Sequence, residues 1–266
     1  MPLFHLLLIA IIQGITEFLP VSSSGHLVLL PQLTGLKDQG QAIDVAVHVG
    51  TLAAVVTYFL SDVKRAALGV THLARAERTA EANLAMCLII ATIPVILAGL
   101  ILKLTGLDDA MRSMAVIGWT MLIFGIVLYW ADQKGPATRP ASSWTLKHAW
   151  TLGLWQAVAL IPGTSRSGAC ITGARLLGYD REGAARIAML MSIPTIIASG
   201  TLVGLEVASD ADLQTAKDGA IAAVFAFFSA LLALSLMMRL LKSVSFTPYV
   251  IYRVLLGIIL LGIAYT

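Results

Sequence analysis

The sequence predicts an all-α integral membrane protein, and two observations support this fold class. Of 266 residues, 58% belong to the hydrophobic set and only 12% are Asp, Glu, Lys or Arg. Soluble domains carry roughly 25% charged residues, so this chain cannot cover a water-soluble surface. The apolar residues also lie in long runs, which excludes disordered and collagen-like chains. The net charge of +3 is too small to indicate a nucleic-acid partner.

Six apolar stretches are long enough to cross a bilayer, which requires about 20 residues of helix. Charges or turn residues bound each of them. We therefore expect one membrane domain over 1–266, with full transmembrane helices at 42–60, 84–102, 113–130, 184–205, 218–241 and 248–265.

Two further apolar stretches, 3–12 and 149–161, cover only about half of that length. Each runs into a segment rich in Pro, Gly and Ser, at 18–26 and 161–168. Broken backbone at membrane depth persists only where protein or a wet cavity surrounds it. We therefore expect two re-entrant helix–loop–helix hairpins, at 3–33 and 149–175.

The two expected hairpins resemble each other at an offset of 143 positions. The matched pairs are Gln13 with Gln156, Ser22 with Ser165, Ser24 with Ser167, and Gly25 with Gly168. Three spans follow each hairpin, and an odd number inserts the second copy upside down. The sequence thus predicts an inverted-topology repeat, with halves at about 1–130 and 149–266 and a site near the midplane.

The distribution of basic residues predicts the orientation. Twelve of the 18 Lys and Arg residues fall in loops on one side of the layout, and three fall in the loops on the other. By the positive-inside rule, the richer side is cytoplasmic. That side comprises 61–83, 131–148, 175–186 and 239–247, so both termini and the mouth of the first hairpin face outward.

Polar residues at membrane depth are expensive and are therefore candidates for function. In the first hairpin, Gln13 and Glu17 share one helix face, as do Ser23 and His26. A hydroxyl, an imidazole and a carboxylate this close together supply a nucleophile, a general acid–base and an orienting group.

The second hairpin presents Ser165, Arg166 and Ser167 between two glycines, Gly163 and Gly168. Free backbone N–H groups and a guanidinium fork suit a phosphate oxyanion. Arg166 lies far from either predicted interface, so an anion partner explains it better than snorkelling.

Each of these residues also has a structural interpretation. Serines 22–24 could cap a helix, His26 could bond a neighbouring helix, and Glu17 could pair with Arg166. Asp44 and His48 form either a helix-face pair or a support behind the site. Arg253 either snorkels outward or reaches a phosphate.

The segments from Gln13 to His26 and from Pro162 to Gly168 resemble the two signature motifs of the bacterial undecaprenyl-diphosphate phosphatases, the bacitracin-resistance protein family. The resemblance extends over the whole chain. It includes the segment from Asp44 to Thr51 and the pair Tyr252–Arg253.

This resemblance implies a hydrolase that acts on a phosphoric anhydride. It would convert undecaprenyl diphosphate to undecaprenyl phosphate and inorganic phosphate in the bacterial inner membrane, recycling the lipid carrier for peptidoglycan synthesis and conferring bacitracin resistance. The implied catalytic residues are Glu17, Ser23, His26 and Arg166. With Asp44 and His48 as support, we expect phosphate contacts from Gln13, Ser22, Ser24, Gly25, Ser165, Ser167, Gly168 and Arg253.

The resemblance also implies a divalent cation, Mg²⁺ or Ca²⁺. Some members carry two glutamates four positions apart, where this chain has Gln13 and Glu17. That difference puts a two-carboxylate metal site in doubt. Glu17 could still bind the cation together with water and the substrate phosphates. The sequence leaves a homodimer open.

Two mechanisms stay open at this point. Either Ser23 attacks phosphorus while His26 takes its proton or later gives one to the leaving lipid phosphate, or His26 or Glu17 activates water. Two other functions stay open too: a transporter that flips the lipid carrier or moves an anion, and an anion channel. The Glu, Ser and His cluster favours the enzyme.

Overall fold

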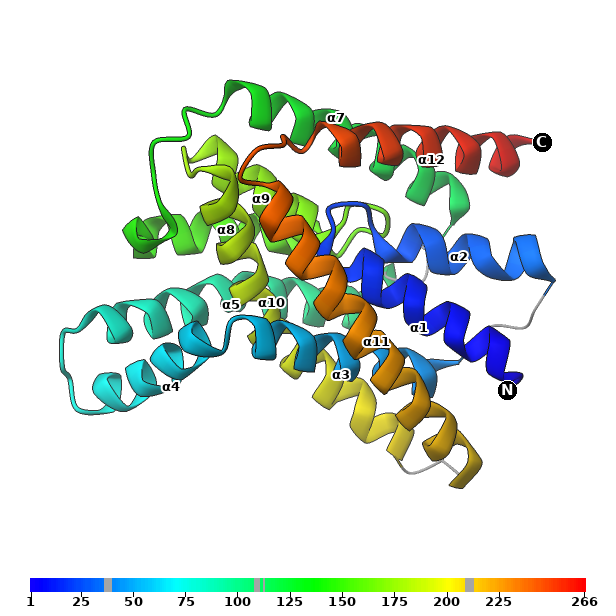
Figure 1. Cartoon of the computed structure of the whole chain (residues 1–266), viewed down its shortest axis with the longest axis horizontal. Helices are drawn as coiled ribbons and strands as arrows, with labels where there is room; N and C mark the ends of the chain where they lie inside the picture. The colour runs from blue at the N-terminus through cyan, green and yellow to red at the C-terminus, as the bar shows by residue number, and fades with distance from the viewer. Residues whose placement is uncertain (36–39, 108–110, 112, 209–212) are drawn as a thin grey trace.

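The structure, a computed structural model, describes all residues except 36–39, 108–110, 112 and 209–212. Its described part is helical apart from an isolated bridge between Arg139 and Tyr179 and the connections (Figure 1). The α-helices are α1 (Leu3–Phe18), α2 (Ser23–Thr34), α3 (Gln41–Tyr58), α4 (Leu60–Ala74), α5 (Ala80–Thr105), α7 (Met114–Lys134), α8 (Leu146–Val158), α9 (Arg166–Leu176), α10 (Arg181–Ala208), α11 (Leu213–Leu240) and α12 (Thr247–Tyr265), with a short 3₁₀ helix at Ala141–Ser143.

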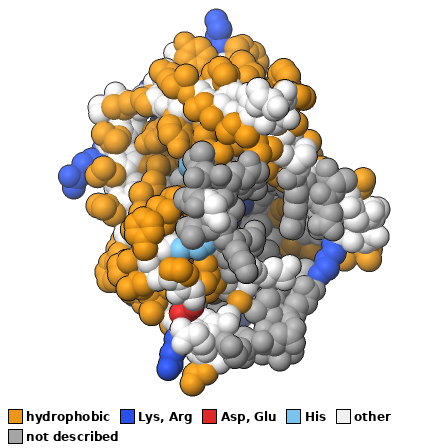
Figure 2. Space-filling view, turned by 90° about the vertical axis from the view of Figure 1, so that its right-hand side faces the viewer, with side chains coloured by type: hydrophobic (Ala, Val, Ile, Leu, Met, Phe, Trp, Pro, Cys, Tyr) orange, Lys and Arg blue, Asp and Glu red, His pale blue; other side chains and the backbone are white. Residues whose placement is uncertain are grey.

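The prediction of six membrane-crossing helices is confirmed for the described residues. Helices α3, α5, α7, α10, α11 and α12 are long and apolar enough to cross a bilayer. Side chains cap three of them, because the Thr79 and Ser113 hydroxyls and the Asp180 carboxylate accept from backbone N–H groups in the first turns of α5, α7 and α10. The surface agrees with lipid contact, since many large apolar side chains are exposed, among them Leu104 at 77% and Leu232 at 67%. Figure 2 shows hydrophobic side chains over much of the described surface at one end of the molecule.

Two pairs of shorter helices occupy the segments that the sequence predicts as hairpins. Helices α1 and α2 flank the loop 19–22, and α8 and α9 flank the loop 159–165. Helix α1 packs on α11 and α3, whereas α8 packs on α5, and α9 packs on α7 and α10. Both loops thus lie inside a frame of longer helices, where they position the site.

Helix α4 was not predicted from the sequence, which placed residues 61–83 in a loop. Its charges, including Asp62 and Arg65, make the stretch look like a surface connection. One face is nevertheless buried, because Gly69 packs against the backbone oxygen of Glu81 in α5. Asp62 also forms an ion pair with Arg186 of α10 at 2.7 Å.

A buried ionic cluster ties the connections together at the end of the molecule opposite the two termini. One oxygen of the Asp132 carboxylate accepts from Arg175 at 3.1 Å and from Arg181 at 2.8 Å, and the other accepts from the Phe246 backbone N–H. The cluster thereby joins α7 to the α9–α10 connection and to the start of α12. Nearby, the pKa of His148 lies below its usual value, first because of burial and then because of neighbouring basic side chains.

Candidate active site

The two interhelical loops have the same unusual backbone. Ser22 and Ser165 both adopt a φ of 70°, a left-handed conformation that is costly for residues other than glycine. In each loop this serine hydroxyl hydrogen-bonds the hydroxyl two positions later, at 3.0 Å for Ser24 and 3.1 Å for Ser167. Strained backbone of this kind clusters at functional sites, and here it occurs at both predicted positions.

The loops also contact each other directly. The Gly163 N–H donates to the Ser24 hydroxyl at 3.1 Å, and the Ser167 hydroxyl donates to the Leu19 carbonyl at 3.0 Å. Two segments almost 150 positions apart therefore form one polar junction, as expected from the sequence.

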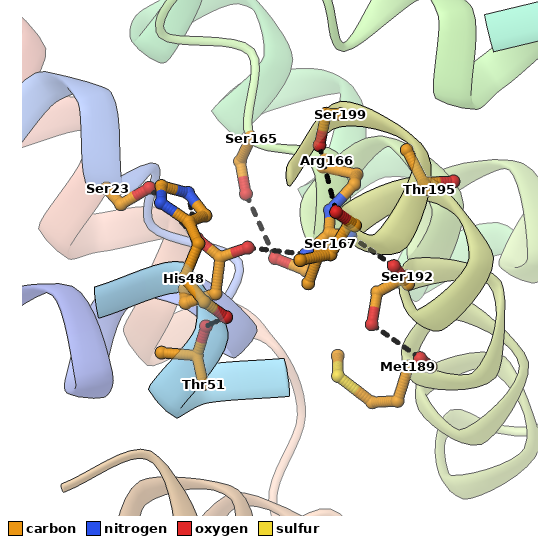
Figure 3. A network of polar contacts seen from close by, with 12 residues as sticks. Ser23, His48, Thr51, Ser165, Arg166, Ser167, Met189, Ser192, Thr195 and Ser199 are labelled. Carbon is orange, nitrogen blue, oxygen red and sulfur yellow. Dashed lines mark hydrogen bonds and ion pairs between the residues drawn. The ribbon is translucent and has the colours of Figure 1, made fainter. Parts of the chain in front are cut away.

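At this junction Glu17 and the partly buried Arg166 form an ion pair, with 2.5 Å between Oε1 and Nη2. The Arg166 guanidinium also donates to the Ser192 carbonyl in α10 at 3.1 Å. On the other side, the Ser23 hydroxyl donates to Oε2 of Glu17 at 3.4 Å. Figure 3 shows Ser23 and His48 on one side of this network and Arg166 with Ser192 on the other. Glu17 thus connects the hydroxyl of one loop to the guanidinium of the other.

Gln13 and His48 hold the Glu17 carboxylate from behind. The Gln13 amide nitrogen lies 2.8 Å from Oε2 of Glu17 and 3.1 Å from Nε2 of His48. Nδ1 of His48 faces the Asp44 carbonyl at 2.7 Å, so Nδ1 carries the proton and Nε2 accepts. Nε2 of His48 is also only 3.7 Å from Glu17. His48 therefore contacts both the Asp44 backbone on its own helix face and the Gln13 amide beside Glu17.

His26 lies at a different place from the one the sequence suggested. Its Nδ1 faces the Ser22 carbonyl at 2.8 Å, and its Nε2 meets the Tyr252 hydroxyl at 2.5 Å, with the two rings stacked. The hydrogen bonds of the described residues do not join His26 to Ser23, because the bond to Ser22 turns the ring away. Sequence reasoning did not assign a role to Tyr252. Its place beside Arg253 in the last span was the available signal.

Several residues expected to contact phosphate have partners within the protein. The hydroxyls of Ser24, Ser165 and Ser167 hold the two loops, and Ser165 caps α9 by accepting from the Gly168 N–H. Gly25 packs so closely that a Cβ there would lie 2.6 Å from the Met121 sulfur. Arg253 is fully buried, so the alternative in which it snorkels outward is wrong.

The donor set does not fit a resident metal ion. Among the described residues, no group of three or more His, Cys, Asp or Glu side chains is placed to hold one. Both oxygens of Glu17 already accept from neighbouring donors, and Arg166 balances its charge. We therefore derive no step through a metal.

The helices and this site define a multi-pass membrane protein with an ionic site buried between two helix–loop–helix units. The chain belongs to the family described as bacitracin resistance protein BacA, which matches residues 6–259. It is 71% identical to an undecaprenyl-diphosphatase of Dinoroseobacter shibae and 68% identical to one of Ruegeria pomeroyi, each over the full length of both chains. It is 44% identical to undecaprenyl-diphosphatase 2 of Stutzerimonas stutzeri, over 98% of each chain. The resemblance that the motifs indicated is confirmed.

Proposed function

We propose that this chain is an undecaprenyl-diphosphatase, which releases inorganic phosphate from undecaprenyl diphosphate and leaves undecaprenyl phosphate. The observation that carries the proposal is the meeting of Ser23, Glu17 and Arg166 where the two loops join. A hydroxyl, a proton acceptor and a fixed cation are the groups that phosphoryl transfer requires. Simple anion transport would not require the buried carboxylate beside the hydroxyl.

In the proposed reaction, the terminal phosphate displaces Glu17 from Arg166, whose guanidinium then neutralises the transferring group. Glu17 is thereby free to take the Ser23 proton across the existing 3.4 Å contact. The Ser23 oxygen bonds to phosphorus while the bridging P–O bond breaks, and undecaprenyl phosphate leaves. Water then hydrolyses the phosphoserine. Direct attack by water activated at Glu17 is the other route.

His26 has a separate role in this proposal. The Ser22 carbonyl and the Tyr252 hydroxyl fix its ring away from Ser23. In that position Nδ1 already carries the ring proton against the Ser22 carbonyl, so Nε2 first takes up a second proton from water and then gives it to the departing lipid phosphate, while the serine proton goes to Glu17. This assignment replaces the expected Ser23–His26 pair with a Ser23–Glu17 pair.

We also propose that the two helix–loop–helix units are re-entrant hairpins in an inverted repeat, with halves at about 1–130 and 149–266. The offset of 143 between the two serine pairs supports this. So does the exchange of packing between the halves, because α1 packs on α11 as α8 packs on α5, while α7 pairs with α12.

We place the protein in the bacterial inner membrane with the site open to the periplasm. The basic connections 61–83 and 131–148 gather at one end of the molecule, and both termini lie at the other (Figure 1). By the positive-inside rule the basic end is cytoplasmic. A homodimer stays a prediction.

The lipid tail requires an apolar path beside the loops. Two apolar grooves of about 580 and 410 Å³ run along α5 and α10 and share Ile96. The second is lined by Leu160, which belongs to the loop before α9. We propose that the isoprenoid lies in these grooves, and that Mg²⁺ or Ca²⁺ arrives bound to its diphosphate.

The test is phosphate release from undecaprenyl or farnesyl diphosphate by purified protein in detergent. Wild type should release phosphate, and Ser23→Ala and Arg166→Ala should not. Ser235→Ala in α11 and Arg239→Ala at its exposed end are the matched controls and should retain activity.

The outcomes separate the alternatives. If release survives Ser23→Ala but not Arg166→Ala, water is the nucleophile. If folded wild-type protein releases no phosphate from either substrate, the enzyme proposal is wrong, and lipid flipping becomes the function to measure.

A further inference from the structure

Arg253 in α12 is a buried cation whose hydrogen bonds, among the described residues, go to backbone carbonyls. Its side chain is completely enclosed. One terminal nitrogen donates to the Pro20 carbonyl at 3.4 Å. The other donates to the carbonyls of Gly163 at 3.1 Å and Thr164 at 2.8 Å. Among the described residues, no ion pair joins Arg253 to a carboxylate. The guanidinium therefore bridges the two loops and does not neutralise an acid.

The two bridged loops are held at equivalent positions. Pro20 and Gly163 are 143 residues apart, the offset that also relates the two hydrogen-bonded serine pairs. Each carbonyl lies three residues before a residue of the proposed site, namely Ser23 in one loop and Arg166 in the other. One planar group thus fixes the two segments that carry the hydroxyl and the phosphate-binding cation.

A glycine of α9 makes room for this side chain, and a glycine of α7 packs beside it at ordinary contact distance. A Cβ on Gly125 of α7 would lie 3.5 Å from the Arg253 Cβ, and a Cβ on Gly168 of α9 would lie 2.7 Å from its Nη1. Helices α7, α9 and α12 therefore close around the guanidinium. A phosphate could reach it only if the loops were displaced, which argues against the expected direct contact with substrate.

We propose that Arg253 is a positioning residue that clamps the two loops and so sets the distance between Ser23 and Arg166. The inference rests on the proposed function. Arginine is required because its planar fork reaches carbonyls on both sides, whereas a lysine ammonium is a single point charge on a flexible stem.

The kinetic test compares Arg253→Lys and Arg253→Met with Arg239→Met, an exposed control on α11. A clamp predicts that both Arg253 variants lower kcat by roughly 100-fold, since a misplacement of about 1 Å costs that much, while KM changes little. A phosphate ligand predicts instead that Lys preserves most of the activity and that Met mainly raises KM. That second pattern would overturn the proposal.

A second measurement does not depend on catalysis. Leu19→Cys and Ser167→Cys, joined by a short bifunctional thiol reagent that does not require disulfide geometry, report the contact between the loops, because the Leu19 backbone carbonyl and the Ser167 hydroxyl are 3.0 Å apart. They are introduced after the buried Cys87 and Cys170 are replaced by Ala. With Arg253 present, the reagent should cross-link the two cysteines rapidly. With Arg253→Met or Arg253→Lys, the rate should fall several-fold, and an unchanged rate refutes the clamp.

The two measurements also separate this inference from the proposed function. If the wild-type protein releases no phosphate but the cross-linking rate still depends on Arg253, the phosphatase assignment fails and the clamp stands. If wild type is active and cross-linking ignores Arg253, the clamp fails alone.

Discussion

Replacement of Glu17 by Gln should tighten the binding of inorganic phosphate while it abolishes turnover. In the structure, the Glu17 carboxylate forms an ion pair with the Arg166 guanidinium. In the proposed mechanism, that guanidinium binds the substrate phosphate. The substitution preserves shape but removes the charge. Phosphate can then bind the Arg166 guanidinium without competing with a carboxylate.

The magnitude follows from the burial of the pair. Removing one partner of a buried salt bridge costs about 3–5 kcal/mol, because the other charge stays buried and unpaired. Arg166 keeps 17% of its side chain exposed and also donates to the Ser192 carbonyl, so the cost of leaving it unpaired is smaller than for a fully buried charge. We take about 1–3 kcal/mol of this cost as the free energy that phosphate binding regains. That range corresponds to roughly 5- to 150-fold tighter phosphate binding. Turnover should fall by about 100-fold or more, because Glu17 is the proposed acceptor of the Ser23 proton.

The assay is a phosphate titration of detergent-solubilised protein by calorimetry, with phosphate release measured in parallel. Glu81→Gln is the matched control, because Glu81 pairs with Arg65 on helices α4 and α5, away from the two loops. It should change neither value. If phosphate binds Glu17→Gln with unchanged or weaker affinity, Glu17 does not compete for Arg166 and the displacement step is wrong.

Four further predictions concern the frame of the site and its cation. Gly163→Ala should destabilise the fold by roughly 2 kcal/mol or more in a denaturant titration, since its φ is +86° and a Cβ would overlap Thr120. Gly200→Ala, in open space on α10, should be neutral or stabilising. Asp132→Asn should lower the free energy of unfolding by about 3–5 kcal/mol, because it leaves buried arginine charge unpaired. The protein that remains folded should keep its kcat. A fall in kcat larger than the loss of folded protein would contradict this prediction. Because burial lowers the pKa of His148, the unfolded chain takes up the proton first as pH falls below about 6.5. The wild-type melting temperature should therefore drop more than that of His148→Asn between pH 7 and pH 5, and parallel curves would refute this. EDTA should slow phosphate release without lowering the melting temperature of substrate-free protein. If the protein held a resident metal, its removal by EDTA would lower both the rate and the melting temperature.

The sequence predicted the spans well because the length of an apolar run is a property of the chain itself. It also predicted that the two broken segments meet, because their repeated serines and glycines indicated equivalent positions. It did not predict helix α4, because the charged side chains of Asp62 and Arg65 near its start are typical of a surface connection. A long apolar run can be recognised from the sequence alone, whereas the stability of a short amphipathic helix depends on the helices that pack against its apolar face.

The partners inside the site were harder to predict. Tyr252 meets His26 across 226 positions, and no local spacing indicates that contact. Arg253 illustrates the same limit, because its residue type suits either a phosphate or a carbonyl clamp. Only the enclosure by α7, α9 and α12 distinguishes these two roles. The sequence allows a structural pairing of Glu17 with Arg166, whereas the proposal that phosphate displaces this contact depends on the position of Ser23 beside Glu17.

The proposed inverted repeat also accounts for the division of chemistry between the loops. At the offset of 143, Ser23 corresponds to Arg166, so the nucleophile and the phosphate-binding cation occupy the same position in the two copies. Each is the first residue of its helix, α2 or α9. A two-fold axis brings equivalent positions together, so it places the two helix starts on opposite sides of one site. Two identical loops would present two hydroxyls or two cations to a phosphate. Divergence at this matched position therefore makes the site complementary to a reaction in which one group attacks phosphorus while the other holds the charge, and the same offset matches Glu17 with Leu160, so the proton acceptor also belongs to one copy alone.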